Sequence, residues 1–268
     1  MEKHIEKIKN SKTVVIKIGT STLTYENGSF NLRRIDKIAR VISDIRNQGK
    51  SVVLVTSGAV CAGTTKLGMK SRPDDLKVKQ AVASVGQVEL MSIYGKMFSQ
   101  YGYNISQILL TKDVMEDEYR RQNVINTFFE LFKLSVIPIV NENDTVTVEE
   151  FLPGVFGEND TLSAVVAHII SAELLIILSD IDGLYNDNPK SNSDAKLIPV
   201  VYEINDEIEK LAGEAGSEFG TGGMKSKISA AKIATGSGCD MIIMNGENID
   251  GIYDIFDGEI PGTIFLSK

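Results

Sequence analysis

The sequence predicts a three-layer α/β fold built on a mainly parallel sheet, and two observations support this prediction. First, six short segments are apolar and rich in β-branched residues on both faces, which is typical of strands that helices cover on both sides. Second, segments of helical periodicity lie between these strands, as parallel strands joined by crossover helices require. The expected strands are Thr13–Ile18, Ser51–Val55, Ile105–Leu110, Val136–Val140, Leu174–Ser179 and Asp240–Met244.

The helices are predicted from apolar residues three and four positions apart, and several begin at an Asn or Asp that can cap a helix. The stretch before the first strand, MEKHIEKIKNSK, is polar, and we expect a frayed tail there that includes His4. Because no long linker divides the chain, we expect residues 1–268 to form a single domain around one continuous sheet. The expected helices are Leu32–Gln48, Asp75–Tyr101, Glu118–Phe132, Asp160–Ile170, Asp206–Ala212, Met224–Gly236 and Ile249–Phe256.

Composition excludes several classes of function. The net charge of -8 over 268 residues argues against a broad nucleic-acid or anionic-membrane surface, although a few buried lysines could still bind a small anion. The chain shows neither a signal peptide nor an apolar run of the roughly 18 residues that a membrane helix needs, so we expect a cytoplasmic protein. Cys61 and Cys239 form neither a disulfide framework nor a zinc site, and we expect both thiols, and His168, to be packed in the core.

Ligands of such folds gather at the carboxyl ends of the parallel strands, so the residues at and after the strand ends are the candidates for a site. Lys17 lies within the apolar run VVIKI, where a lysine is costly unless it reaches a cleft or an ion-pair partner. Ser57 and Gly58 stand at a strand-to-helix junction. They offer a hydroxyl and backbone N–H groups to an anion, although the serine could also be a simple helix cap.

Two polar loops follow the Val136–Val140 strand. The first, NENDTV, places the polar side chains of residues 141–144 together. This cluster could bind an ammonium group or a metal, or the Asn and Asp residues could simply form a turn. The second, FGENDTLSA, places Asn159 and Asp160 at the head of an apolar helix. Asp160 could cap that helix or hold two lysines in register.

The nucleotide-binding candidates lie in the last third of the chain. Ser179 and Asp180 end a buried strand, where a nucleotide could contact them. The stretch GTGGMKSK, residues 220–227, is a glycine-rich turn that leads into a helix; its spacing fits neither a P-loop nor the GxGxxG fingerprint. Backbone N–H groups at such a helix start face phosphate oxygens. Lys225 and Lys227 point about 200° apart on a helix, so only one of them can face a site squarely.

Taken together and in order, these motifs resemble those of the amino acid kinase family. The motifs are KIGTST, VTSGAV, ASVGQ (Ala83–Gln87), VNENDTV, FGENDTLSA, SDIDGLY and GTGGMKSK, and the resemblance extends from about Thr13 to Leu266. Within the family, the chain is most similar to the members that phosphorylate glutamate in the first step of proline biosynthesis. The resemblance implies an αβα sandwich with an eight-stranded sheet, an amino-acid-binding lobe over about 1–170 and a nucleotide-binding lobe over about 171–268.

The resemblance also implies an activity, ATP-dependent phosphorylation of the γ-carboxylate of L-glutamate to γ-glutamyl phosphate. Lys17 and Lys227 would flank the transferred phosphoryl group, and Asp160 would orient both lysines. Mg²⁺ would accompany the ATP without a full cage of protein ligands. The implied glutamate contacts are Ser57, Asn141, Asp144 and Asn159. The implied nucleotide contacts are Lys17, Ser179, Asp180, Thr221, Gly222, Gly223, Met224, Lys225, Ser226 and Lys227.

Three departures from the family pattern and several open alternatives accompany this prediction. Ser179 stands where threonine is usual, Glu158 stands where aspartate is common, and we expect no C-terminal PUA domain and hence no RNA contact. The resemblance implies a homo-oligomer, a tetramer or a dimer, and feedback inhibition by proline. The acceptor could instead be acetylglutamate, aspartate, carbamate or uridine monophosphate, or the chain could be a sensor without catalysis. A sensor would be expected to lack one of the two lysines or the aspartate, all of which are present.

Overall fold

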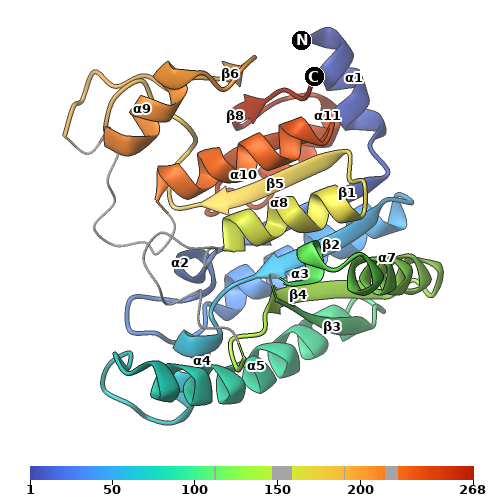
Figure 1. The fold of residues 1–268 in the computed structure, drawn as a ribbon, viewed down its shortest axis with the longest axis vertical. Helices are drawn as coiled ribbons and strands as arrows, with labels where there is room; N and C mark the ends of the chain where they lie inside the picture. Colours follow the sequence, from blue (N-terminus) through green and yellow to red (C-terminus); the bar gives the residue numbers. More distant parts are fainter. Residues whose placement is uncertain (112, 147–158, 190, 215–222) are drawn as a thin grey trace.

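A computed structural model describes residues 1–111, 113–146, 159–189, 191–214 and 223–268. The described residues form one sheet of eight strands in the order β3-β4-β2-β1-β5-β7-β8-β6 (Figure 1). The pairings between neighbouring strands are parallel except for that of β7 with β8, so the predicted mainly parallel sheet is confirmed. The strands are β1 Thr13–Ile18, β2 Ser51–Thr56, β3 Ile105–Leu110, β4 Ile137–Glu142, β5 Leu174–Ser179, β6 Val200–Val201, β7 Asp240–Asn245 and β8 Gly262–Phe265.

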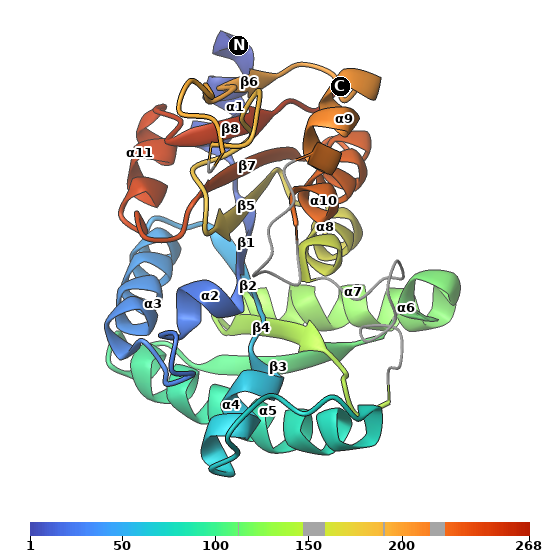
Figure 2. The same ribbon diagram turned by 90° about the vertical axis from the view of Figure 1, so that its left-hand side faces the viewer.

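Helices cover both faces of this sheet, which gives the three predicted layers (Figure 2). In Figure 2, α3 and α11 lie on one side of the central strands, and α8 and α10 lie on the other side. Within the described ranges, no helix is both long enough and apolar enough to span a membrane. The helices are α1 Glu2–Asn10, α2 Thr20–Leu23, α3 Leu32–Asn47, α4 Ala59–Lys66, α5 Leu76–Ser99, α6 Asp113–Glu116, α7 Glu118–Lys133, α8 Asn159–Ile169, α9 Asp206–Glu214, α10 Met224–Gly236 and α11 Gly251–Asp257.

Strand β1 shows why the central strands are apolar on both faces. Its successive side chains point to opposite sides of the sheet. Val14, Ile16 and Ile18 therefore join the core beneath α3 and α5, whereas Val15 joins the core beneath α8 and α10. Lys17 follows Val15 on the second face, at the position where a further apolar residue would complete that core. The lysine is therefore directed toward α8 and α10, which places it in a layer of the protein where it needs a partner.

The predicted helix starts agree with the structure where a side chain caps the helix. Asn31, Asp75 and Asp117 each accept a hydrogen bond from the backbone N–H three residues later, at the starts of α3, α5 and α7. The elements that sequence analysis missed are short or weakly patterned, namely α1, α2, α4, α6, β6 and β8. Strand β6 has only two residues, so no periodicity could identify it.

The predicted positions of the two cysteines and of His168 were partly wrong. Cys239 is fully buried, and burial raises the pKa of its thiol to about 12. Cys61 is only half-buried, beside the carbonyl oxygen of Gly28. His168 is exposed rather than part of the core, although residues on either side of it in α8 are buried. His168 lies on the outer stripe of an otherwise apolar helix. The prediction was wrong because the residues next to His168 in the sequence are apolar and by themselves predict burial.

The prediction of a frayed amino-terminal tail was also wrong. Helix α1 buries Ile8 completely, and it places His4 and Lys7 against Asp240 at the start of β7. The Asp240 carboxylate is fully buried and lies 3.1 Å from His4 Nδ1 and 3.3 Å from Lys7 Nζ. It also accepts a 2.6 Å hydrogen bond from the backbone N–H of Ser267. One carboxylate thus joins the first helix, a central strand and the end of the chain.

We expect Asp240→Ala to lower the free energy of unfolding by about 2–3 kcal/mol. Loss of one partner from a fully buried pair costs about 3–5 kcal/mol, and the Lys7 side chain is 34% exposed, which reduces the penalty. Urea denaturation of both proteins measures the difference. The matched control is Glu203→Ala, which removes the exposed pair with Lys268 and should change stability by about 0.5 kcal/mol or less. Equal effects of the two substitutions would contradict the role assigned to Asp240.

Candidate active site

The carboxyl ends of the central strands meet at one edge of the sheet, and the predicted motifs gather there. The parallel registers place Lys17 beside Val55 and Ile177, and Val55 beside Val140. Each of β1, β2, β4 and β5 therefore ends at a similar level along the sheet. Residues more than 100 positions apart in the sequence become neighbours at this edge, as strand-end sites of open α/β sheets require.

Asp160 lies between the two predicted lysines. Its Oδ1 is 2.7 Å from Lys17 Nζ, and its Oδ2 is 3.0 Å from Lys227 Nζ. Asp160 is 1% exposed, Lys17 8% and Lys227 5%, so the whole group is shielded from water. Asp160 stands in the first turn of α8 and Lys227 in the first turn of α10, and these two helices pack against each other (Figure 1). The structure thus brings together all three residues predicted to be catalytic.

The Asp160 carboxylate is ionised at neutral pH. Burial by itself would raise the pKa of Asp160, but the charges of Lys17 and Lys227 and hydrogen bonds from Lys17 and Ser226 hold it well below its usual value. Ser226 Oγ donates the latter bond over 2.8 Å. Counted over these three side chains alone, one carboxylate and two ammonium groups carry a net charge of about +1. A buried surplus of positive charge favours an anion such as a phosphoryl group.

A set of side-chain amides occupies the neighbouring part of the site. Asn159 Nδ2 lies 2.8 Å from Ser57 Oγ, 3.1 Å from Asn141 Oδ1 and 3.1 Å from the backbone oxygen of Thr56. Three of the four predicted glutamate contacts therefore touch one another. The fourth, Asp144, follows β4 and is 7% exposed. It contributes a carboxylate to the same strand-end loop, where an ammonium group would find a counterion.

The structure describes most of the nucleotide-side candidates at the end of β5 and the start of α10. Ser179 is buried at the end of β5, and its Oγ donates to Asp180 Oδ1 over 3.1 Å. Gly223 is the N-cap of α10, which begins at Met224 as predicted. Thr221 and Gly222, together with Glu158 of the acceptor-side loop, lie outside the described residues.

The first turn of α10 separates its two lysines in the way that helical geometry predicts. Lys225 is exposed, whereas Lys227 is buried against Asp160. Ser226, between them, hydrogen-bonds to the same carboxylate, a contact that sequence reasoning did not assign. Only the packing of α10 against α8 places this hydroxyl near Asp160, so no local sequence signal could have identified it.

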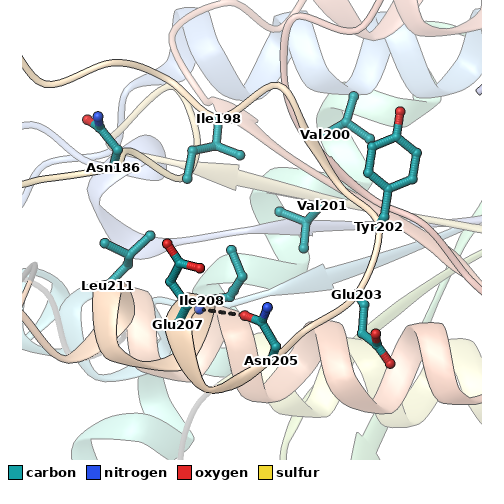
Figure 3. Close-up of a pocket in the computed structure, with 10 residues that line it drawn as sticks. All are labelled: Asn186, Ile198, Val200, Val201, Tyr202, Glu203, Asn205, Glu207, Ile208 and Leu211. Carbon is teal, nitrogen blue, oxygen red and sulfur yellow. Dashed lines mark hydrogen bonds between the residues drawn. The ribbon is translucent and has the colours of Figure 1, made fainter.

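A pocket of about 390 Å³ lies elsewhere in the carboxyl-terminal half, beside α9 and β6 (Figure 3). Asn205 caps α9 there by accepting a 3.1 Å hydrogen bond from the backbone N–H of Ile208. None of the residues predicted for the site lines this pocket. Its lining is Asn186, Ile198, Val200, Val201, Tyr202, Glu203, Asn205, Glu207, Ile208 and Leu211. In the described ranges, no three His, Cys, Asp or Glu side chains gather as a metal site would require.

Comparison with known proteins agrees with the fold and with the motifs. The model of the amino acid kinase family matches residues 12–245. The chain is 54% identical to a glutamate 5-kinase of Clostridium perfringens, covering 97% of both chains. It is 53% identical to a glutamate 5-kinase of Listeria innocua, covering 98% of this chain and 96% of the relative.

Solved structures of more distant proteins share the fold. UMP kinase from Ureaplasma parvum superposes with a TM-score of 0.65 at 14% identity, covering 96% of this chain and all of that structure. Carbamate kinase from Giardia lamblia gives a TM-score of 0.65 at 17% identity, covering 97% of this chain and all of that structure. The family model covers most of the chain, and the sheet order and the paired lysine and carboxylate at the strand ends agree with it. The chain belongs to the amino acid kinase family.

Proposed function

We propose that this protein phosphorylates the γ-carboxylate of L-glutamate with ATP, giving γ-glutamyl phosphate and ADP in the first step of proline biosynthesis. The observation that carries the proposal is the buried group of Lys17, Asp160 and Lys227. It supports phosphoryl transfer because it concentrates positive charge where a phosphoryl group would pass between two anions. The 54% identity to a glutamate 5-kinase supports glutamate as the acceptor.

The reaction needs positioning and charge stabilisation more than proton transfer. A carboxylate is already ionised at pH 7, so no general base is required. An oxygen of the γ-carboxylate forms a bond to the γ-phosphorus of ATP, and the bond from that phosphorus to the β–γ bridging oxygen breaks. The electron pair of the broken bond leaves with ADP. The obstacle is the approach of two negatively charged groups, which the protein has to offset.

Each charged residue of the group has a separate task in this scheme. Lys17, at the end of β1, offsets charge on the transferring phosphoryl group. Lys227, at the start of α10, offsets charge that develops on the leaving β–γ oxygen. Asp160 holds both ammonium groups in place and reduces their mutual repulsion when no nucleotide is bound. The arrangement is therefore set before the substrates arrive, which lowers the reorganisation needed in the transition state.

The amide cluster would bind the acceptor. Ser57, Asn141 and Asn159 provide neutral hydrogen-bonding groups, and Asp144 provides a carboxylate for the ammonium group of glutamate. Residues of about 1–170 would therefore form the amino-acid lobe. Residues of about 171–268 would form the nucleotide lobe, with Ser179, Asp180 and the Thr221–Lys227 segment on the phosphate side.

The proposal includes Mg²⁺ as the companion of ATP. Mg²⁺ prefers oxygen ligands and keeps several waters, so phosphate oxygens would supply much of its coordination, and it would neutralise phosphate charge. Asp180, which is exposed beside Ser179, would lie on the nucleotide side of the site. We include proline as a feedback inhibitor that competes for the amino-acid lobe, and a homo-oligomeric assembly, in the same proposal.

Hydroxylamine trapping of the acyl phosphate tests the proposed function. Purified protein with Mg-ATP and hydroxylamine should form a hydroxamate from glutamate and little or none from aspartate or acetylglutamate. ADP release with uridine monophosphate or carbamate covers acceptors that do not yield a hydroxamate. A hydroxamate from aspartate or acetylglutamate but not from glutamate would overturn the acceptor assignment. If the protein binds ATP but phosphorylates none of these acceptors, the hypothesis of a sensor without catalysis would be favoured.

A further inference from the structure

Gln87, on the long helix α5, touches the acceptor side of the site without belonging to a strand-end loop. It is 8% exposed, and it follows Gly86 in the ASVGQ motif. A Cβ atom at Gly86 would lie 1.7 Å from the backbone oxygen of Ala59, and one at Gly63 would lie 1.9 Å from that of Val82. The two glycines therefore allow α5 and α4 to pack backbone to backbone. This close approach fixes the depth at which Gln87 enters the site.

The backbone determines which way the amide of Asn141 faces. Asn141 Oδ1 accepts a 2.9 Å hydrogen bond from the N–H of Glu142, so the oxygen cannot be exchanged with the nitrogen. The Nδ2 group must then be the donor on the other side, and it donates to Gln87 Oε1 over 2.9 Å. Gln87 thus supplies the acceptor that this orientation of Asn141 requires.

The orientation of Asn159 is determined in the same way. Its Nδ2 donates to the backbone oxygen of Thr56, and the same group reaches Asn141 Oδ1 and Ser57 Oγ. A continuous chain of hydrogen bonds therefore runs from Gln87 on α5 through Asn141 on β4 to Asn159 on α8. Ser57, after β2, lies at its end. Gln87 is the one member of this chain that comes from a helix remote from the strand ends.

The two ends of the Gln87 amide differ in their hydrogen bonding, because the oxygen accepts from Asn141 and the buried nitrogen has no partner among the described residues. An apolar side chain at this position would instead leave Asn141 Nδ2 without an acceptor. The Asn141 amide could then rotate away from Asn159 and Ser57. Gln87 therefore satisfies the Asn141 donor and keeps the Asn141 amide turned toward Asn159 and Ser57.

We propose that Gln87 is a positioning residue for the acceptor amino acid, acting through Asn141 on the Asn159–Ser57 pair. The inference rests on the proposed function, since it assigns these amides to acceptor binding. The side-chain hydrogen bond of Gln87 goes to Asn141, so its influence is directed to the acceptor side of the site. It should therefore affect the KM for the acceptor and leave the KM for ATP nearly unchanged.

The test compares two substitutions that differ in one acceptor atom. Gln87→Met keeps the length of the side chain and removes the acceptor, and it should raise the KM for glutamate by about 10-fold, the order expected for a lost buried hydrogen bond. The KM for ATP should stay within about twofold. Gln87→Glu keeps an oxygen at the Oε1 position and should stay within about threefold of the parent KM for glutamate. Gln100→Met, at the exposed C-cap of α5, is the matched control and should change neither KM.

A double substitution checks that Gln87 acts through Asn141. Adding Gln87→Met to Asn141→Ala should raise the KM for glutamate no further, because the link is already broken. Three results would overturn the inference: an unchanged KM in folded Gln87→Met, equal rises for glutamate and ATP, or a Gln87→Glu variant as impaired as Gln87→Met.

Failure of the proposed function gives a different result from failure of this inference. If the parent protein uses another acceptor, the glutamate assay fails in the parent itself, and the same variants are compared with the acceptor that is used. Calorimetric binding of the acceptor gives the same comparison in the absence of turnover. An active parent with an unaffected Gln87→Met variant would count against the role of Gln87 alone.

Discussion

Asp160→Ala should lower kcat by about 100-fold or more. Its two oxygens lie 2.7 Å and 3.0 Å from Lys17 Nζ and Lys227 Nζ, so the substitution leaves two buried ammonium groups without the charge between them. Two like charges a few ångströms apart repel by roughly a few kcal/mol at an effective dielectric constant of about 20. The lysines would then separate or recruit water, and the preorganised field on the phosphoryl group would be lost. Loss of one preorganised group typically costs about 100- to 1000-fold.

Steady-state hydroxamate formation measures this effect, and two further variants locate its cause. Asp160→Asn keeps the size of the side chain and removes its charge, so it should be impaired nearly as much as Asp160→Ala. Asp254→Ala removes an exposed aspartate from the first turn of α11 on the opposite face of the sheet and should retain activity within about twofold. Thermal unfolding separates loss of catalysis from loss of fold. Near-normal turnover in folded Asp160→Ala would refute the role of the carboxylate.

The parts of the fold that the sequence predicted accurately are those in which local pattern and burial agree. Strands β1 and β5 and helix α10 match the predicted bounds, because each is a short buried apolar run or a regular helix between clear start and stop signals. Strand β3 also matches its predicted bounds, although it lies at the edge of the sheet and buries only Leu110. Helix α1 was missed because its buried face is narrow: Ile8 is its one buried residue. Its polar contacts with the rest of the fold include Asp240, which is more than 230 positions away in the sequence.

The residues of the candidate site could be predicted from the sequence, but the contacts between their side chains could not. The residue types at the strand ends identify Lys17, Asn141 and Asp160 as candidates, since polar groups there are costly unless they bind something. The contacts among them depend on the strand order β4-β2-β1-β5, which no local window of sequence reports. The hydrogen bond from Ser226 to Asp160 and the acceptor role of Gln87 arise only when helices pack across that sheet.

Lys227→Ala should cost far more activity than Lys225→Ala, by a factor of about 100. The two residues stand in the same helical turn and differ in direction. Lys227 is buried with its Nζ 3.0 Å from Asp160 Oδ2, whereas Lys225 is exposed. Removal of Lys227 takes away half of the positive charge that faces the phosphoryl group and leaves Asp160 to neutralise Lys17. The surplus charge of about +1 then falls to about zero, so the attraction for the nucleotide phosphates disappears from this group.

A charge-conserving substitution separates charge from geometry at this position. Lys227→Arg keeps the charge on a larger, planar group that cannot occupy the same buried space. We therefore expect it to recover only part of the activity lost in Lys227→Ala. Lys225→Arg should be close to the parent, because an exposed lysine tolerates the larger group. The reverse order of the two alanine variants would show that Lys225 is the residue that reaches the nucleotide, and α10 would then have to rotate by about half a turn when ATP binds.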